Sequence, residues 1–284
     1  MTRGEVLITV AELAERLSTG EPPVILDVRW RLDRPDGRDD YLAGHLPGAV
    51  YVSLEDDLSD HRRTGLGRHP LPSGTDLQVA ARRWGLRDGH PVVVYDDWNR
   101  AGSCRAWWVL TAAGIADVRI LDGGLSAWTV AGGELHGGPA RPAAGTVSVV
   151  HDDLYVGGRP TLTAQQIGDE QVAVLLDARA PERFRGESES VDPVAGHIPG
   201  AQNTPITSVL ATDGTFRTDA ELGALFEQTA IDAATEVGVY CGSGITASVV
   251  LAALHVSGIH AALFPGSWSQ WTAEPGRGVA RGPV

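Results

Sequence analysis

The sequence predicts an α/β fold built of two tandem domains, each a mainly parallel sheet flanked by helices. Short apolar runs alternate with helical patterns along the chain, which is typical of parallel strands buried on both faces and joined by crossover helices. Several segments of the first half recur in the same order in the second half, so the repeat spans about half of the 284 residues. A duplicated domain explains this better than a solenoid, whose units are about 20–50 residues long.

The predicted strands and helices follow from hydrophobic periodicity. "VILD" (24–27) and "VVVY" (92–95) are continuous apolar runs, which favours buried strands. "ELGALFEQTA" (221–230) and "ASVVLAALHVSG" (247–258) repeat apolar residues every three or four positions, which predicts amphipathic helices. Four matched pairs carry the duplication: "VILDVRW" (24–30) with "VLLDARA" (174–180), "YLAGHLPGAVYVSL" (41–54) with "PVAGHIPGAQNTPI" (193–206), "PVVVYDD" (91–97) with "VGVYCGS" (237–243), and "AAGIADVRILDGGLSAW" (112–128) with "VSGIHAALFPGSWSQW" (256–271).

The segment between the two copies has the composition of a linker. Residues 132–146, "GGELHGGPARPAAGT", are rich in Gly, Pro and Ala. We therefore assign residues 1–135 to the first domain, 136–152 to the linker and 153–284 to the second domain.

Composition limits the classes of partner and chemistry. The formal net charge of −13 argues against nucleic acid or an anionic membrane as a partner. All 23 basic residues are arginine, which removes lysine-based Schiff-base chemistry. Two cysteines without CxxC spacing and unclustered histidines predict neither a disulfide framework nor a metal site. No G-x-G-x-x-G follows the first strand of either copy, so we expect no dinucleotide and no other cofactor.

The pattern of apolar residues also bears on location. No stretch approaches the 18 uninterrupted apolar residues of a membrane span, and acidic residues interrupt the N-terminal apolar run before signal-peptide length. We therefore expect a cytoplasmic protein with free thiols.

Cys241 is the strongest candidate for catalysis. In "VGVYCGSGITASVVLAAL" it follows a predicted strand and precedes a glycine-rich turn and a helix, where ligands of parallel α/β sheets gather. Inward-pointing N–H groups and the positive end of the helix would stabilise a thiolate there. Gly242 and Gly244 permit close approach, and Thr246 is a candidate to cap the helix. The alternative is an inert buried cysteine beside a tight turn.

The motifs "GHIPGA", "LDGGLSAW" and "CGSGITA", with their copies, resemble the tandem-domain rhodanese family of sulfurtransferases. The resemblance implies two rhodanese-like domains, of which only the second carries the nucleophile. The matching position in the first copy is Asp96, so that domain is expected to be catalytically silent, with Cys104 a packing residue. The implied reaction takes sulfur from a donor onto Cys241 as a persulfide and passes it to cyanide, a thiol or a thioredoxin-like partner, without a metal.

The loop sequence suggests the donor. "CGSGITA" is one conservative change from the "CGSGVTA" typical of the 3-mercaptopyruvate branch, whereas the thiosulfate branch carries basic residues after the cysteine. We therefore expect 3-mercaptopyruvate as the donor, with thiosulfate as the alternative. In this reading Ser243 relays a proton to the departing pyruvate enolate, unless it only completes the turn. The other loop residues, namely Gly242, Gly244, Ile245 and Thr246, are expected to surround the donor.

An arginine is expected to anchor the donor carboxylate. Arg183, in "APERFRGE", matches the family position, and a guanidinium binds a carboxylate through two parallel hydrogen bonds. A surface salt bridge with Glu182 or Glu187 is the alternative, and Arg185 is a second candidate for the same role. The family resemblance implies a second carboxylate-binding arginine nine residues after the first, but that position is Asp192 here. This departure counts against 3-mercaptopyruvate, and it leaves open either a different donor or an arginine supplied from elsewhere in the cleft.

The resemblance also implies a histidine in the proton relay. His45, in "GHLPGA", matches the family histidine, and Asp40 or Asp39 is a candidate to orient it. His197 is its counterpart in the second copy, so a structural role for both is an equally good explanation. Trp30 is a candidate to line the cleft, or else a core residue.

Two other functions are considered, of which the sequence disfavours the first and is compatible with the second. A cysteine phosphatase needs an arginine that closes the loop around phosphate, and residues 242–250 contain neither arginine nor lysine. A module that delivers persulfide sulfur to a protein partner is compatible with the sequence, because the loop does not specify the acceptor.

Overall fold

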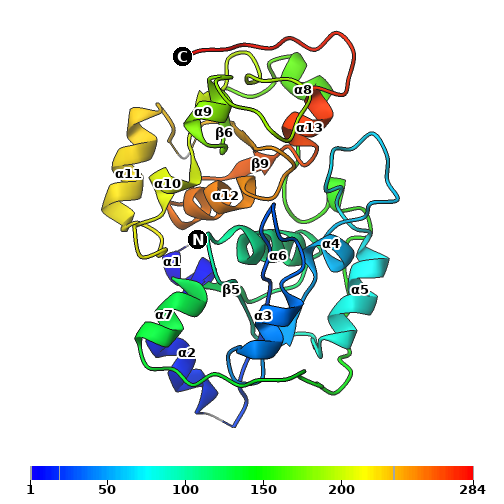
Figure 1. The fold of residues 1–284 in the computed structure, drawn as a ribbon, viewed down its shortest axis with the longest axis vertical. Coiled ribbons are helices and arrows are strands. Elements are labelled where there is room, and N and C mark those ends of the chain that lie inside the picture. The colour runs from blue at the N-terminus through cyan, green and yellow to red at the C-terminus, as the bar shows by residue number, and fades with distance from the viewer. Residues whose placement is uncertain (1, 19, 233, 284) are drawn as a thin grey trace.

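The computed structural model describes residues 2–18, 20–232 and 234–283, and it contains two parallel sheets (Figure 1). The first sheet has the strand order β1-β5-β4-β2-β3, formed by β1 (Leu7–Ile8), β5 (Val118–Leu121), β4 (Val92–Tyr95), β2 (Val24–Asp27) and β3 (Val50–Tyr51). The second has the order β7-β6-β8-β9, formed by β7 (Gln202–Asn203), β6 (Val174–Asp177), β8 (Val237–Tyr240) and β9 (Ala261–Leu263). The predicted strands 24–27 and 92–95 are confirmed, and the α/β class with them.

Helices flank both sheets. Those of the first half are α1 (Arg3–Val6), α2 (Val10–Leu17), α3 (Arg38–Ala43), α4 (Leu54–Asp57), α5 (Gly74–Arg83), α6 (Ala101–Ala112) and α7 (Gly124–Val130). Those of the second half are η1 (Leu154–Val156), a 3-10 helix, α8 (Ala164–Gly168), α9 (Pro181–Phe184), α10 (Ile206–Val209), α11 (Asp219–Gln228), α12 (Ala247–Val256) and α13 (Ser267–Trp271). Residues 131–153, all of them described, form no helix or strand.

The predicted helix boundaries move by two residues for local reasons. The helix expected over 221–230 is α11, which begins earlier because the side chains of Thr218 and Glu221 form a capping box. The helix expected over 247–258 is α12, which ends earlier because Gly258 takes a positive φ of 76°.

The amphipathic pattern expected for α12 is wrong, because every residue from Ala247 to Val256 is buried. The helix packs on its own sheet on one side and against α6 of the first half on the other (Figure 1). Helix α6 is buried almost all round for the same reason. One hydrophobic core therefore runs through both halves, with residues such as Trp107 and Leu110 of α6 and Leu251 and Leu254 of α12.

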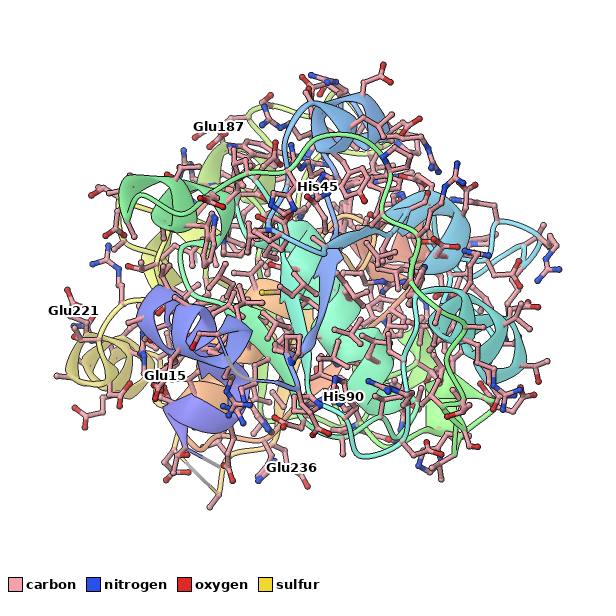
Figure 2. All side chains as sticks on the ribbon, turned by 90° about the horizontal axis from the view of Figure 1, so that it is seen from below. Glu15, His45, His90, Glu187, Glu221 and Glu236 are labelled. Atoms are coloured by element: carbon pink, nitrogen blue, oxygen red, sulfur yellow. The ribbon has the colours of Figure 1, made fainter. Side chains whose placement is uncertain are left out.

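Acidic side chains cover much of the outside. Glu15, Glu187, Glu221 and Glu236 are exposed, and the last three lie toward the edge of the molecule in Figure 2. No helix among the described residues is both long enough and apolar enough to cross a membrane.

Candidate active site

A cavity of about 610 Å³ lies between the two halves, at the carboxyl end of β8. The first half contributes Trp30, Arg68 and Trp98 to its wall, and the second contributes Arg183 and the loop after β8. Parallel sheets place ligands at this end of their strands. The loop residues that line the cavity are Cys241, Gly242, Ser243, Ile245 and Thr246.

Cys241 is held at the base of this loop. Its side chain is buried, and its Sγ accepts the N–H of Gly244 at 3.2 Å. Its own N–H donates to Ser267 Oγ at 3.1 Å, and its carbonyl accepts the N–H of Trp268 at 3.0 Å. Two hydrogen bonds to the start of α13 therefore hold the loop in place. The backbone N–H of Gly244 also points at the sulfur, which favours an anionic sulfur.

Gly244 is not among the residues that line the cavity, in contrast to the expectation from the sequence. Glycine is nevertheless required at this position. Gly244 has a positive φ of 78°, and a Cβ there would lie 2.5 Å from the carbonyl oxygen of Pro265. The expectation that Thr246 caps the helix is wrong: it is the N-cap of α12, yet its side chain makes no capping hydrogen bond. Thr246 lines the cavity instead.

Ser243 forms a hydrogen-bonded chain with two residues of the first half. Its Oγ lies 2.8 Å from Nδ1 of His69, and Nε2 of His69 lies 3.3 Å from Oε1 of Glu55. An ionised carboxylate only accepts hydrogen bonds, so a neutral His69 carries its proton on Nε2 and Nδ1 accepts from the serine hydroxyl. This tautomer is assigned from the hydrogen-bond partners.

The protonation states follow from burial and contacts. Burial lowers the pKa of His69 from its ordinary value of 6.5, and attraction to Glu55 offsets this only in part. Burial alone would raise the pKa of Glu55, but hydrogen bonds from His69, Trp30 and His61 outweigh it and bring that pKa to about 2. At neutral pH the three hydrogen-bonded residues are therefore an ionised Glu55, a neutral His69 and Ser243 with its hydroxyl protonated.

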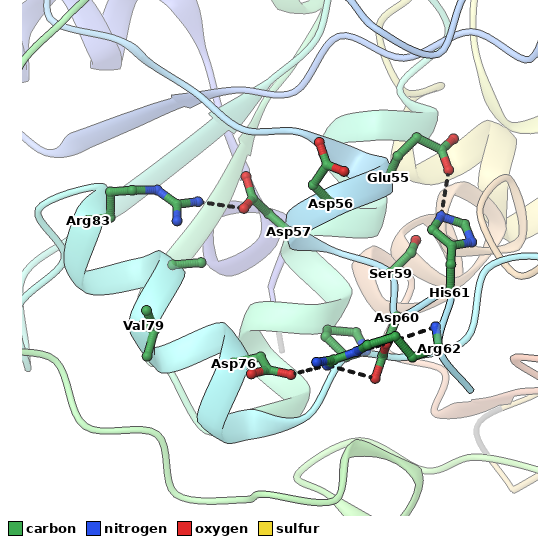
Figure 3. A pocket seen from close by; sticks show the side chains of 12 residues that line it. Glu55, Asp56, Asp57, Ser59, Asp60, His61, Arg62, Asp76, Val79 and Arg83 are labelled. Atoms are coloured by element: carbon green, nitrogen blue, oxygen red, sulfur yellow. Dashed lines mark hydrogen bonds and ion pairs between the residues drawn. The ribbon is translucent and has the colours of Figure 1, made fainter.

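Glu55 lies in the first turn of α4, and its carboxylate contacts Trp30 and His61 in addition to His69. Trp30 Nε1 donates to its Oε1 at 2.6 Å, so this tryptophan both lines the cavity and orients the carboxylate. The other oxygen lies 2.9 Å from Nε2 of His61 (Figure 3). That contact borders a separate acidic cavity of about 390 Å³ against α4 and α5, which Cys241 does not line.

Arg183 lines the cavity, but its ion pairs differ from those expected. Its Nη2 lies 2.8 Å from Glu189 and 3.2 Å from Asp192, rather than against Glu182 or Glu187. Arg185 pairs with Glu187 at the surface and is not among the residues that line the cavity.

Arg105 connects the loop to the first half. This arginine of α6 is fully buried and donates to the carbonyl oxygens of Gly244, Leu58 and His69 at 3.0–3.2 Å. Burial lowers its pKa to about 10, which leaves it charged at neutral pH. No described carboxylate forms an ion pair with Arg105, and attraction to Tyr155, Cys241 and Glu55 offsets part of the effect of burial on its pKa.

The comparison with known proteins agrees with this arrangement. The rhodanese-like domain model matches residues 9–131 and again residues 160–274. The chain belongs to the rhodanese family. It is a tandem-domain sulfurtransferase, as its relatives below are.

Three relatives illustrate the family resemblance. The chain is 65% identical over 280 residues to the Mycobacterium tuberculosis protein named "Putative thiosulfate sulfurtransferase SseB", with 99% of this chain and 98% of that protein covered. It is 35% identical over 268 residues to the 3-mercaptopyruvate sulfurtransferase of Escherichia coli K12, with 92% of each covered. The crystal structure of SseA from Escherichia coli, a 3-mercaptopyruvate sulfurtransferase, superposes with a TM-score of 0.76 at 32% identity over 95% of this chain and 100% of that one.

The first rhodanese domain has no cysteine at the position that corresponds to Cys241. At the position of Cys241 stands Asp96, which accepts hydrogen bonds from the N–H and Oγ of Ser103 at 3.0 and 2.7 Å and pairs with Arg100 at 3.0 Å. A Cβ on Gly124 would overlap the Arg100 guanidinium, so this side chain fills the space beside the loop. Cys104 is fully buried, and burial raises the pKa of its thiol far above the usual range, which supports a packing role.

The expectation that His45 joins the relay is corrected by the structure. Its Nδ1 lies 2.8 Å from the carbonyl oxygen of Tyr41, and its ring stacks on that tyrosine at 4.1 Å. His197 makes the same contacts with Phe184 in the second domain, at 2.8 and 3.8 Å. The repeated GH-x-PGA motif thus has a structural role in both rhodanese domains, and the histidine beside Ser243 is His69.

Asp40 does not orient a catalytic histidine either. It forms a half-exposed ion pair with Arg34 at 2.5 Å. The carboxylate in contact with His69 is Glu55, which sequence reasoning missed because both Glu55 and His69 lie outside the duplicated segments. Both residues lie in a stretch of the first half that has no counterpart in the second. This difference between the halves was the one feature of the sequence that could have indicated them.

Proposed function

We propose that this sulfurtransferase uses 3-mercaptopyruvate as its donor and forms a persulfide on Cys241. The observation that carries the proposal is the 2.8 Å hydrogen bond between Ser243 and His69. When sulfur leaves 3-mercaptopyruvate, the carbon fragment departs as an enolate that needs a proton to become pyruvate. Sulfite, which departs from thiosulfate, needs none. A serine–histidine–carboxylate chain beside the nucleophile therefore matches the first donor.

The first half-reaction begins with proton transfer. The Cys241 thiol passes its proton through Ser243 to Nδ1 of the neutral His69, and Glu55 stabilises the resulting imidazolium. The thiolate attacks the sulfur of the donor, an S–S bond forms, and the C–S bond breaks with its electron pair on the enolate. His69 then returns the proton through Ser243 to the enolate carbon. Cys241 is left as a persulfide and pyruvate is released.

The second half-reaction removes the outer sulfur. A thiolate or cyanide attacks it and takes it away, and Cys241 leaves as a thiolate held by the N–H of Gly244. We infer that the acceptor in the cell is a small thiol or a thioredoxin-like protein. We infer that the protein acts in the cytoplasm, where such thiols are kept reduced.

Thiosulfate is the second candidate donor. It is supported by the name of the 65% identical relative and by the aspartate at position 192, where a second carboxylate-binding arginine was expected. The loop itself has no basic residue to clamp a sulfonate, so any cationic partner must come from elsewhere in the cavity wall.

The test is a side-by-side measurement of kcat/KM for 3-mercaptopyruvate and thiosulfate, with cyanide as acceptor. We expect a preference for 3-mercaptopyruvate of about a hundredfold, or about 2.7 kcal/mol of transition-state stabilisation. Cys241→Ser is the blank and is expected to lose transfer from both donors while it keeps its fold. A preference for thiosulfate would contradict the proposed donor, and activity in Cys241→Ser would contradict the persulfide.

A further inference from the structure

Two arginines from different domains meet over the residue that follows the nucleophile. Arg68 precedes His69 in the first domain, Arg183 belongs to α9 of the second, and both line the cavity that contains Cys241. A Cβ built on Gly242 would lie 3.1 Å from Nη2 of Arg68 and 3.7 Å from Nη1 of Arg183. Both guanidinium groups therefore reach the backbone of the catalytic loop.

Carboxylates occupy the other edges of these guanidinium groups. Glu189 accepts from Nε and Nη2 of Arg183 at 2.8–3.2 Å. Asp192 accepts from Nη2 of Arg183 at 3.2 Å and from Nη1 of Arg68. Among the described residues, neither Nη2 of Arg68 nor Nη1 of Arg183 has a hydrogen-bond acceptor. The two N–H groups nearest the loop therefore have no protein partner, and neither has the buried Nε of Arg68.

The position of Arg68 is fixed by the second domain. Its backbone N–H donates to Ser269 Oγ at 3.1 Å, and the residue before it, Gly67, has a φ of 86° with Gly266 packed so closely that a Cβ would lie 2.5 Å from its carbonyl oxygen. The side chain is anchored by Asp192, whose carboxylate is only 2% exposed. An arginine held at both ends in this way loses little further freedom when a ligand binds.

We propose that Nη2 of Arg68 and Nη1 of Arg183 together bind the anionic group of the sulfur donor, and that Asp192 positions Arg68 for this task. The ligand class is a compact oxyanion, either the carboxylate of a 2-oxo acid or the sulfonate of thiosulfate. The inference rests on sulfur transfer at Cys241 but not on which of the two donors is used. It explains how a site with aspartate at position 192 still offers two guanidinium groups: the second comes from the silent domain.

The first test is the donor KM of Arg68→Ala. Because a hydrogen bond to a charged group contributes about 1.5–3 kcal/mol, we expect KM to rise about tenfold or more for whichever donor the enzyme accepts. We expect a much smaller change in kcat. The matched control is Arg62→Ala, which removes an exposed arginine of the same segment that pairs with Asp60 and Asp76. That variant is expected to keep the KM of the unmodified enzyme.

A second readout does not depend on turnover. Pyruvate or sulfate, bound in the cavity, should protect Cys241 from the uncharged reagent iodoacetamide, and Arg68→Ala should need about tenfold more of either anion for the same protection. Protection by pyruvate alone, by sulfate alone or by both shows which oxyanion the pair accepts. Unchanged KM and unchanged protection in Arg68→Ala would overturn the inference, even if the proposed donor were right. Use of thiosulfate alone would overturn the proposed donor but leave the role of Arg68 to be decided by its KM.

Asp192→Asn tests the positioning role. It keeps a hydrogen-bond acceptor but removes the charge that orients Arg68, so we expect a smaller rise in KM than for Arg68→Ala. In the double variant the two effects should not add, because Asp192 acts through Arg68. Additive effects would contradict the positioning role.

Discussion

Ser243 and His69 lie 174 positions apart in the chain and meet through one hydrogen bond. The sequence indicated Cys241, Ser243 and Arg183 because they lie in motifs with a recognisable chemical order, and all three line one cavity. It did not indicate His69, Glu55 or Arg68, because these residues lie outside the repeated motifs. His45 was the wrong histidine, since a motif that recurs in both domains reports a contact made in both domains.

The pH profile tests the assignment of His69. Because burial lowers its pKa below 6.5, His69 stays neutral and able to accept the cysteine proton down to that pH. We expect kcat/KM for 3-mercaptopyruvate to fall toward acid pH with a midpoint below 6.5, as His69 becomes protonated. His69→Gln should be slow throughout and lack this acid limb. An acid limb centred above 6.5, or one that survives in His69→Gln, would contradict the assignment.

At the scale of elements, the strands were predictable because continuous apolar runs have few other solutions in an α/β chain. The ends of the helices were less predictable, because they depend on side-chain caps and on glycines with positive φ. The full burial of α12 was not predictable, because its outer face is covered by a helix of the other domain and local periodicity contains no information about that partner.

The catalytic loop depends on glycine at one position. Gly244→Ala would force a left-handed φ of 78° on alanine and push its Cβ against the carbonyl of Pro265. We expect a loss of stability of about 1–3 kcal/mol, seen as a lower Tm, together with a large loss of kcat because the N–H held on Cys241 Sγ moves.

Gly258→Ala is the matched control for that substitution. Gly258 has a similar φ of 76°, but nothing lies within 4 Å of a Cβ built there. It should share the conformational cost and keep kcat. Equal kcat in both variants would mean that the loop tolerates displacement of Gly244.

At the scale of the whole molecule, both domains build the candidate active site. The first supplies Trp30, Glu55, Arg68 and His69 to the cavity or to its hydrogen-bonded residues, and Arg105 to the loop itself. A duplicated sequence suggests two similar halves, whereas the two halves contribute different residues to the cavity: Cys241 and its loop come from the second domain, and the residues hydrogen-bonded to Ser243 come from the first.

The continuous core predicts that the two domains unfold together. Helices α6 and α12 bury each other in one hydrophobic cluster, so the loss of either domain would expose a fully buried helix of the other. We expect one calorimetric transition whose calorimetric and van't Hoff enthalpies agree. Two separated transitions would contradict a shared core, and so would a calorimetric enthalpy well above the van't Hoff enthalpy.

The measurement that tests the central claim most directly is the donor dependence of Ser243→Ala. In the proposed mechanism Ser243 and His69 carry the proton that the pyruvate enolate needs and that sulfite does not. We therefore predict that kcat for 3-mercaptopyruvate falls about a hundredfold, within the range of general acid–base catalysis, while kcat for thiosulfate falls much less. Equal losses with both donors would contradict the relay and leave Ser243 as a residue that only completes the turn.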